Sequence, residues 1–152
     1  MQEAILIEFA RAIIAGVSVF VIGQVLSDFY LNPVNELRKN IGEAKFAIIF
    51  RANIYCNPGN GDVEQNKKLF RERETTAIEL RRAASKLFTA NDSIKAYKIF
   101  YWFNILPSQT ALVDAATYMI GLSNSVHNGN CKLNVSQKEK CMQAFNSYKF
   151  SR

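Results

Sequence analysis

The sequence predicts an all-α protein with one N-terminal transmembrane helix followed by a cytoplasmic bundle of about five helices. Three observations support this fold class. The 152-residue chain has only three prolines and seven glycines, which favours long regular elements over many short strands. A run near the N-terminus, residues 12–27, carries no charged side chain. The remainder places apolar residues at helical spacing and shows no alternating strand pattern of useful length.

The charge-free run predicts a membrane span. Its residues would rise roughly 24 Å as a helix, and the apolar residues on both sides extend the apolar body from residue 4 to residue 31. This length suits a hydrocarbon core of about 30 Å. Phe29 and Tyr30 end the segment with an aromatic pair typical of a membrane–water interface. Two alternatives are a cleaved signal peptide, which the acidic N-terminus disfavours, and the core helix of a soluble bundle.

The charge distribution predicts the orientation of the span. Up to Leu31 one basic residue stands against three acidic ones, whereas 18 Lys and Arg stand against 10 Asp and Glu after it. Cytoplasmic flanks of membrane helices are enriched in Lys and Arg. We therefore expect residues 1–31 to form a transmembrane anchor with its N-terminus outside, and residues 32–152 to form a cytoplasmic helical domain.

One face of the predicted span consists mostly of small or polar residues, and we call it the small-residue stripe. Its members fall within about 100° of one another on a helical wheel. They are Glu8, Ala12, Gly16, Val19, Gly23 and Ser27. Small residues let helix backbones approach closely, so we expect the stripe to contact another copy of the chain or another protein and, in an oligomer, to face a pore. The alternative interpretation is that Gly and Ala are simply common in membrane helices.

The first part of the cytoplasmic domain predicts two helices. Asn32-Pro33 combines an N-cap residue with a proline at the first helical position, and the turn cluster 56–62 should end that helix. Asp62 can cap a second helix that runs to about Phe88 and ends at the sequence TANDS, residues 89–93. The apolar faces of the two helices are Leu37, Ile41, Ala44, Ile48, Ala52 and Tyr55, then Leu69, Thr76, Leu80, Ala83, Ala84 and Leu87.

The second part predicts three more helices. The aromatic stretch 94–106 predicts a short buried helix, and Pro107-Ser108 ends it and opens the next. Ser136 and Glu139 form a capping box for the last helix. The apolar faces are Leu112, Ala115, Ala116, Met119 and Leu122 in the fourth helix and Cys141, Phe145 and Tyr148 in the last.

Residue types that carry catalysis or bind metals are sparse. The chain has one histidine and three cysteines without metal-type spacing, and no Walker lysine follows the glycines of NPGNG. Cys56 and His127 could in principle form a nucleophile–base pair, but a loop histidine and a capping or core cysteine is the favoured interpretation. We expect no enzyme activity, no metal and no cofactor. The cysteines should be free thiols in a reducing compartment, the alternative being a Cys131–Cys141 disulfide.

Basic residues crowd the predicted helix 62–88. Arg71 and Arg82 lie about three turns apart on nearly the same face. Such a surface could bind phosphate in RNA or in a nucleotide signal, or anionic lipid. The interleaved acids support the alternative of a solvated, salt-bridged face. The candidate phosphate-binding or nucleic-acid-binding residues are Lys67, Lys68, Arg71, Arg81, Arg82 and Lys86.

Five stretches, NPVNELRKNIGEAKFAII, RANIY, ELRRAASKL, LPS and IGLSNSV, resemble a group of small, mostly uncharacterised bacterial proteins that have an N-terminal membrane helix and a cytoplasmic helical domain. The resemblance covers most of residues 31–126. The architecture is also similar to the membrane-anchored HEPN-like accessory proteins of CRISPR systems, which assemble a membrane pore in antiviral defence. The HEPN nuclease motif is absent, because Leu122, Gly121 and Ile120 stand where an arginine would precede His127.

The resemblance implies a homo-oligomeric effector or pore-forming accessory protein of the bacterial inner membrane that perturbs this membrane in antiphage, CRISPR-linked defence. Its partners would be membrane lipid, other copies of the chain and a defence-system protein. Two other hypotheses stay open. One is an anchored sensor or adaptor that binds a nucleotide, RNA or a protein through its basic helix without forming a pore. The other is a soluble helical protein.

Overall fold

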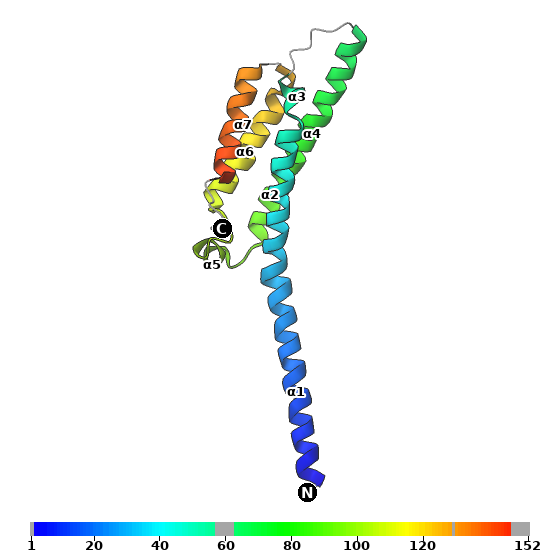
Figure 1. Cartoon of the computed structure of the whole chain (residues 1–152), viewed down its shortest axis with the longest axis vertical. Coiled ribbons are helices and arrows are strands. Elements are labelled where there is room, and N and C mark those ends of the chain that lie inside the picture. The colour runs from blue at the N-terminus through cyan, green and yellow to red at the C-terminus, as the bar shows by residue number, and fades with distance from the viewer. Residues whose placement is uncertain (1, 57–62, 129, 147–152) are drawn as a thin grey trace.

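The computed structural model describes residues 2–56, 63–128 and 130–146 (Figure 1). Nearly all of these residues are helical and none of them is in a strand, which confirms the predicted all-α class. The NPGNG turn, the Asp62 cap and Tyr148 of the predicted last helix lie outside the described residues.

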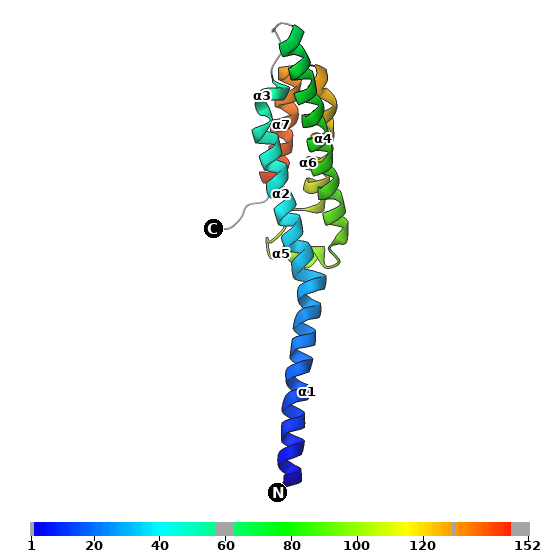
Figure 2. The ribbon, with the colours of Figure 1, turned by 90° about the vertical axis from the view of Figure 1, so that its right-hand side faces the viewer.

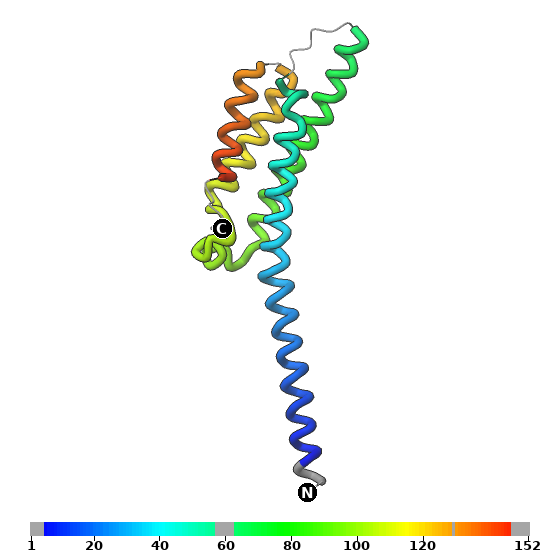
Figure 3. Tube along the Cα trace, in the orientation of Figure 1, coloured from blue at the N-terminus to red at the C-terminus, as the bar shows by residue number. Residues whose placement is uncertain are grey.

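The N-terminal third of the chain is one continuous helical rod (Figures 1 and 3). It comprises α1 (Gln2–Leu26), a π-helical turn η1 (Ser27–Leu31) and α2 (Asn32–Phe50). α2 begins at Asn32, with Pro33 in its first turn. The predicted N-cap that would open a separate helix at Asn32 is wrong, because Asn32 is itself helical and its backbone amide donates to the carbonyl of Ser27.

The proline explains the widened turn. Pro33 has no N–H, and inside an α-helix its ring would crowd the carbonyl of the residue four positions earlier, Phe29. A π-turn closes its hydrogen bonds over five residues and so gives the ring more room. The rod therefore accommodates a proline that would otherwise end or kink it.

Four long helices form the bundle and alternate in direction along it (Figures 1 and 2). α4 packs against both α2 and α6, and α7 packs on α6 and also contacts α2. The four long helices are α2, α4 (Val63–Ser93), α6 (Gln109–Ser125) and α7 (Cys131–Asn146). The short elements are α3 (Ala52–Tyr55), α5 (Tyr97–Trp102) and the 3-10 turn η2 (Val126–Asn128).

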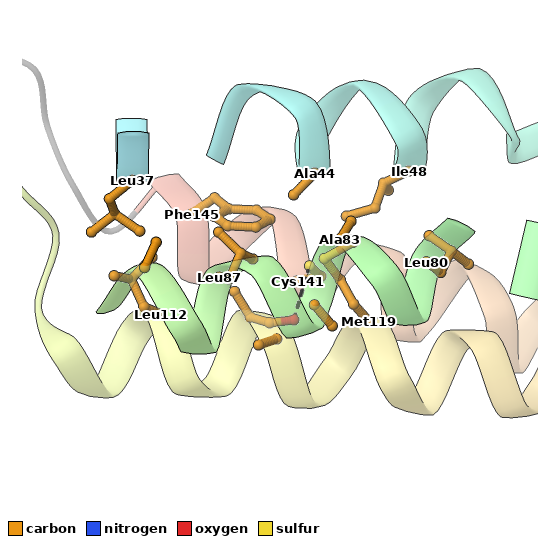
Figure 4. Packing of buried hydrophobic residues seen from close by; sticks show 14 of the residues in the cluster. Leu37, Ala44, Ile48, Leu80, Ala83, Leu87, Leu112, Met119, Cys141 and Phe145 are labelled. Atoms are coloured by element: carbon orange, nitrogen blue, oxygen red, sulfur yellow. Dashed lines mark hydrogen bonds between the residues drawn. The ribbon is translucent and has the colours of Figure 1, made fainter. Parts of the chain in front are cut away.

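The predicted apolar faces meet in one core (Figure 4), except that Leu69 of the predicted face on α4 is only half-buried and lies outside this core. Leu37 and Ile48 of α2, Leu87 of α4 and Met119 of α6 are buried. Cys141 of α7 is buried too, and its thiol donates to the Ala115 carbonyl at 3.3 Å. Helical periodicity was sufficient to identify this core, because each helix buries the residues that recur every three or four positions.

The predicted end of α4 at residues 89–93 is wrong, because the helix continues to Ser93. The segment contains no proline or glycine that would stop a helix. Ala90 and Asn91 are both buried, so packing holds the last turn in helical form.

The capping pattern confirms one predicted helix start and corrects another. Ser108 caps α6, since its Oγ accepts the backbone N–H of Ala111 at 3.1 Å. The capping box at Ser136 and Glu139 is wrong, because α7 begins at Cys131 and both residues lie inside it. Asn130 supplies the cap instead, as its Oδ1 accepts the N–H of Leu133 at 3.1 Å.

Residues 94–106 do not form the predicted buried helix. Only Tyr97–Trp102 is α-helical, and within it Tyr97 is buried whereas Tyr101 and Trp102 are exposed. Aromatic density alone does not indicate burial here, because a helix this short directs only part of its circumference toward a core.

The three cysteines are free thiols. The alternative Cys131–Cys141 disulfide is excluded, because the two residues lie ten positions apart on α7. At 1.5 Å per residue their separation is roughly 15 Å, whereas disulfide-bonded Cα atoms lie within about 7 Å.

Candidate functional site

The first candidate site is α1, which projects from the bundle without packing on it (Figures 1 and 2). Every residue from 5 to 26 is exposed, including large side chains such as Phe20 at 71%. The rod that begins at Ile5 is the one helix in the described part of the chain that is long and apolar enough to cross a membrane. The core-helix alternative does not fit this arrangement, because none of the other described elements covers α1.

The small-residue stripe lies along this exposed helix. α1 is a regular α-helix, so the spacing of Glu8, Ala12, Gly16, Val19 and Gly23 keeps them on one face. Ser27, the last member, is the first residue of the π-turn. A Cβ added at either glycine would meet no atom within 4 Å. Packing within the protomer therefore does not require the glycines, and the stripe is open to a partner.

Polar side chains on the exposed part of the rod satisfy one another. Arg11 pairs with Glu8 at 2.9 Å, and the Ser18 hydroxyl donates to the Ile14 carbonyl at 2.8 Å. Asp28 accepts from the side-chain amides of Gln24 at 2.9 Å and Asn32 at 3.0 Å. Internal hydrogen bonds reduce the cost of placing polar groups in an apolar environment.

The second candidate site, the basic surface of α4, separates into two groups. Arg81 donates to Ser123 at 3.2 Å and to Asn124 at 2.8 Å, both at the end of α6. Lys86 pairs with Glu43 of α2 at 2.8 Å and lowers the pKa of that carboxyl. The other four are exposed, and their charged groups make no hydrogen bond or ion pair with a described residue. They are Lys67, Lys68, Arg71 and Arg82.

Lys67, Lys68 and Arg71, near the start of α4, lie at the end of the bundle farthest from α1 (Figure 1). Lys67 and Arg71 line a shallow hollow of about 410 Å³ together with Val63, Asn66 and Phe70. A membrane entered by α1 does not reach this end of the bundle.

His127 and Cys56, the suggested nucleophile–base pair, have other neighbours. The His127 ring packs on Phe70, with 5.4 Å between ring centroids. Burial raises the pKa of Cys56 to about 11, and a hydrogen bond with Cys131 contributes to the same shift. A raised pKa keeps the thiol protonated at neutral pH, which is the opposite of what nucleophilic activation requires.

Sequence reasoning missed a basic cavity of about 410 Å³ between α2 and the connection from α5 to α6. Arg38 and Lys45 line it from α2, and Ile105 and Phe145 provide apolar walls. The signal that could have found it is the seven-residue spacing of Arg38 and Lys45, which places both on one helical face. Within the described residues, no group of three or more His, Cys, Asp and Glu side chains is arranged to hold a metal ion.

Comparison with protein-family models, with curated proteins and with solved structures finds no match to this chain.

Proposed function

We propose that the chain is a single-pass protein of the bacterial inner membrane that self-associates through α1 and perturbs the membrane, as an effector or pore-forming accessory protein in antiviral, CRISPR-linked defence. The observation that carries the proposal is the exposure of α1 along residues 5–26. Burying one large apolar side chain is favourable by about 1.5–3 kcal/mol. The chain buries none of those between residues 5 and 26, and a bilayer supplies the missing apolar surroundings.

Self-association is supported by the stripe. Lipid chains gain nothing from a face of small residues, whereas a second helix can approach it closely. The stripe also places Glu8 near the end of the span. In an oligomer, repeated copies of this carboxylate would form a ring that favours cations over anions.

The orientation follows from the flanks of the span. Arg38, Lys39 and Lys45 follow it at the bundle end, so the bundle is proposed to be cytoplasmic. The role in defence is supported by the resemblance to small bacterial membrane proteins and to HEPN-like accessory proteins, an analogy of architecture.

Cross-linking in membranes tests the oligomer. Gly16→Leu and Gly23→Leu should separate the helices and reduce the cross-linked oligomer, because the added side chains occupy the contact face. Val17→Leu and Val21→Leu are the matched controls, since they face roughly the opposite side of the helix. Equal oligomer yields from the two pairs would show that the stripe is not the interface.

Ion flux from liposomes tests the pore. The wild-type chain should release ions, with a preference for cations that Glu8→Gln reduces while the oligomer persists. An oligomer that carries no flux would favour the second candidate function below.

The second candidate function is an anchored sensor or adaptor without a pore, which binds RNA, a nucleotide or a protein partner. The unpaired cations Lys67 and Arg71 at the membrane-distal end favour it. Lys67→Glu with Arg71→Glu should abolish phosphate-dependent binding, and wild-type binding should fall steeply with salt. Arg81→Glu is the contrasting variant, because Arg81 already bonds to α6. Binding that withstands high salt would contradict this function.

A further inference from the structure

The element α5 presents a cluster of large exposed side chains, which we call the aromatic foot: Ile99, Tyr101, Trp102 and Phe103. Trp102 is 78% exposed and Phe103 is 62% exposed. Their rings pack edge to face, with centroids 5.0 Å apart. An exposed patch of this composition is unusual on a soluble surface and marks an interaction site.

The fold holds the foot in place from behind. The Tyr97 hydroxyl donates to the Pro107 carbonyl at 2.8 Å, and Leu106 is fully buried. Asn104 adopts a left-handed conformation with φ of 56°. Its amide donates to Tyr101 at 2.9 Å, and the amide of Ile105 donates to Phe100 at 2.8 Å. These are the two hydrogen bonds of a Schellman motif. The exposed rings therefore stand on a defined backbone.

The foot lies at the end of the bundle where the rod emerges as α1, in both views of the ribbon (Figures 1 and 2). A side-chain contact fixes this level. The ammonium group of Lys95, just before α5, lies 5.1 Å from the centroid of the Phe29 ring. Phe29 belongs to the aromatic pair that ends the proposed span. The foot is thus near the height at which α1 would leave the hydrocarbon core.

The chemistry of the foot matches the headgroup region of a bilayer. Trp and Tyr concentrate at this boundary because their rings are partly apolar and partly polar. Lys95 and Lys98 flank the rings and are exposed, which suits anionic lipid headgroups. If the foot bound a protein partner instead, it would not need to lie level with the end of the proposed span in α1.

We propose that the aromatic foot inserts into the headgroup–acyl boundary of the leaflet that α1 leaves, so that the bundle contacts the membrane at two points. This inference rests on the proposed membrane span. It adds that the bundle is held close against the bilayer surface rather than carried freely at the end of the rod.

Trp102 is the single tryptophan of the chain and reports directly on the foot. The full-length protein is reconstituted into vesicles of phosphatidylethanolamine and phosphatidylglycerol that contain lipids brominated near the headgroup. Carbonate extraction is measured in the same samples. We expect a blue-shifted emission, loss of most of it to bromine quenching, and weaker quenching for Lys95→Gln with Lys98→Gln.

The matched variants move the tryptophan. Trp102→Phe with Phe103→Trp keeps the probe in the foot and should be quenched like the wild type. Trp102→Phe with Phe50→Trp places it on an exposed position of α2 toward the other end of the bundle, and it should not be quenched. Circular dichroism confirms that each variant is folded.

The outcomes separate the two claims. Protein that resists carbonate extraction but shows unquenched, water-like Trp102 emission overturns the foot and leaves the span standing. A blue-shifted but unquenched emission also overturns it, because the ring is then buried against protein. Protein that carbonate extracts, with no quenching, overturns both claims.

Discussion

The two halves of the N-terminal rod share one helical backbone but have different surroundings. α1 exposes every described side chain from residue 5 onward, whereas α2 buries a residue at intervals of three or four positions: Val34, Leu37, Asn40, Ala44 and Ile48. Helix formation is thus common to both halves, and the side-chain pattern decides the environment. α1 exposes large apolar side chains on most of its circumference, whereas α2 buries one face and exposes charged residues on the other, together with Phe46, Ile49 and Phe50.

Cutting between the two halves should have the largest effect. Deletion of residues 1–31 removes the exposed apolar helix and none of the core residues. We expect a soluble, helical fragment that unfolds cooperatively, measured by circular dichroism, while the full chain stays in the carbonate-resistant membrane pellet. An insoluble or unfolded fragment would show that α1 belongs to the fold.

The same side chain truncated in each half should give unequal losses. Leu37 is fully buried in α2 and Leu26 is 51% exposed in α1. Leu37→Ala should lower the free energy of unfolding of the bundle by about 2–5 kcal/mol. Leu26→Ala should change it by less than about 0.5 kcal/mol. Denaturant titration in detergent compares the two, and similar losses would contradict the division of the rod.

Ion pairs allow a finer version of the same comparison. Arg51 at the end of α2 holds Glu79 of α4 through two bonds of 2.8 and 2.6 Å, and the Glu79 carboxylate raises the pKa of Arg51. Glu79→Gln should lower the free energy of unfolding by about 1 kcal/mol. Glu8→Gln, which removes the partner of Arg11, should leave bundle unfolding unchanged. A loss from Glu8→Gln equal to that from Glu79→Gln would refute the contrast.

Glycine replacement should have the smallest effect. A Cβ at Gly42 of α2 meets no atom within 4 Å, so Gly42→Ala should raise the free energy of unfolding by about 0.5–1 kcal/mol through helix propensity. Gly23→Ala in α1 should leave bundle unfolding unaltered, because α1 lies outside the packed core. Thermal melts in detergent are sensitive enough to compare them, and a stabilised Gly23→Ala bundle would be the contrary result.

Periodicity predicted the core because burial in a long amphipathic helix depends on local spacing alone. Leu37, Leu87 and Met119 were assigned to the core from sequence and are buried. The exposure of Trp102 could not be predicted this way, because aromatic composition is the same for a core helix and for a surface cluster. Its position depends on the Tyr97–Pro107 bond and on the left-handed Asn104, which are tertiary and turn features.

The candidate sites were predictable only in part. The charge-free run identified α1, and charge density identified the basic helix. The sequence could not show that Arg81 and Lys86 are engaged while Arg71 and Arg82 are unpaired, because the partners of the first two come from α6 and α2. Contacts between residues more than forty positions apart leave no signal in local spacing.

The widened turn at Ser27–Leu31 changes the rotation of the bundle about the long axis of the rod. It adds one residue to the turn, so the bundle is rotated about the rod axis by roughly 100° relative to an uninterrupted α-helix. The turn therefore determines the angle about the rod axis between the bundle and the small-residue stripe on α1. Conversion of this π-turn to a regular α-helical turn would rotate the bundle about the rod axis and separate Lys95 from Phe29. In an assembly whose stripes are locked together, this single turn dictates which flanks of adjacent bundles face each other.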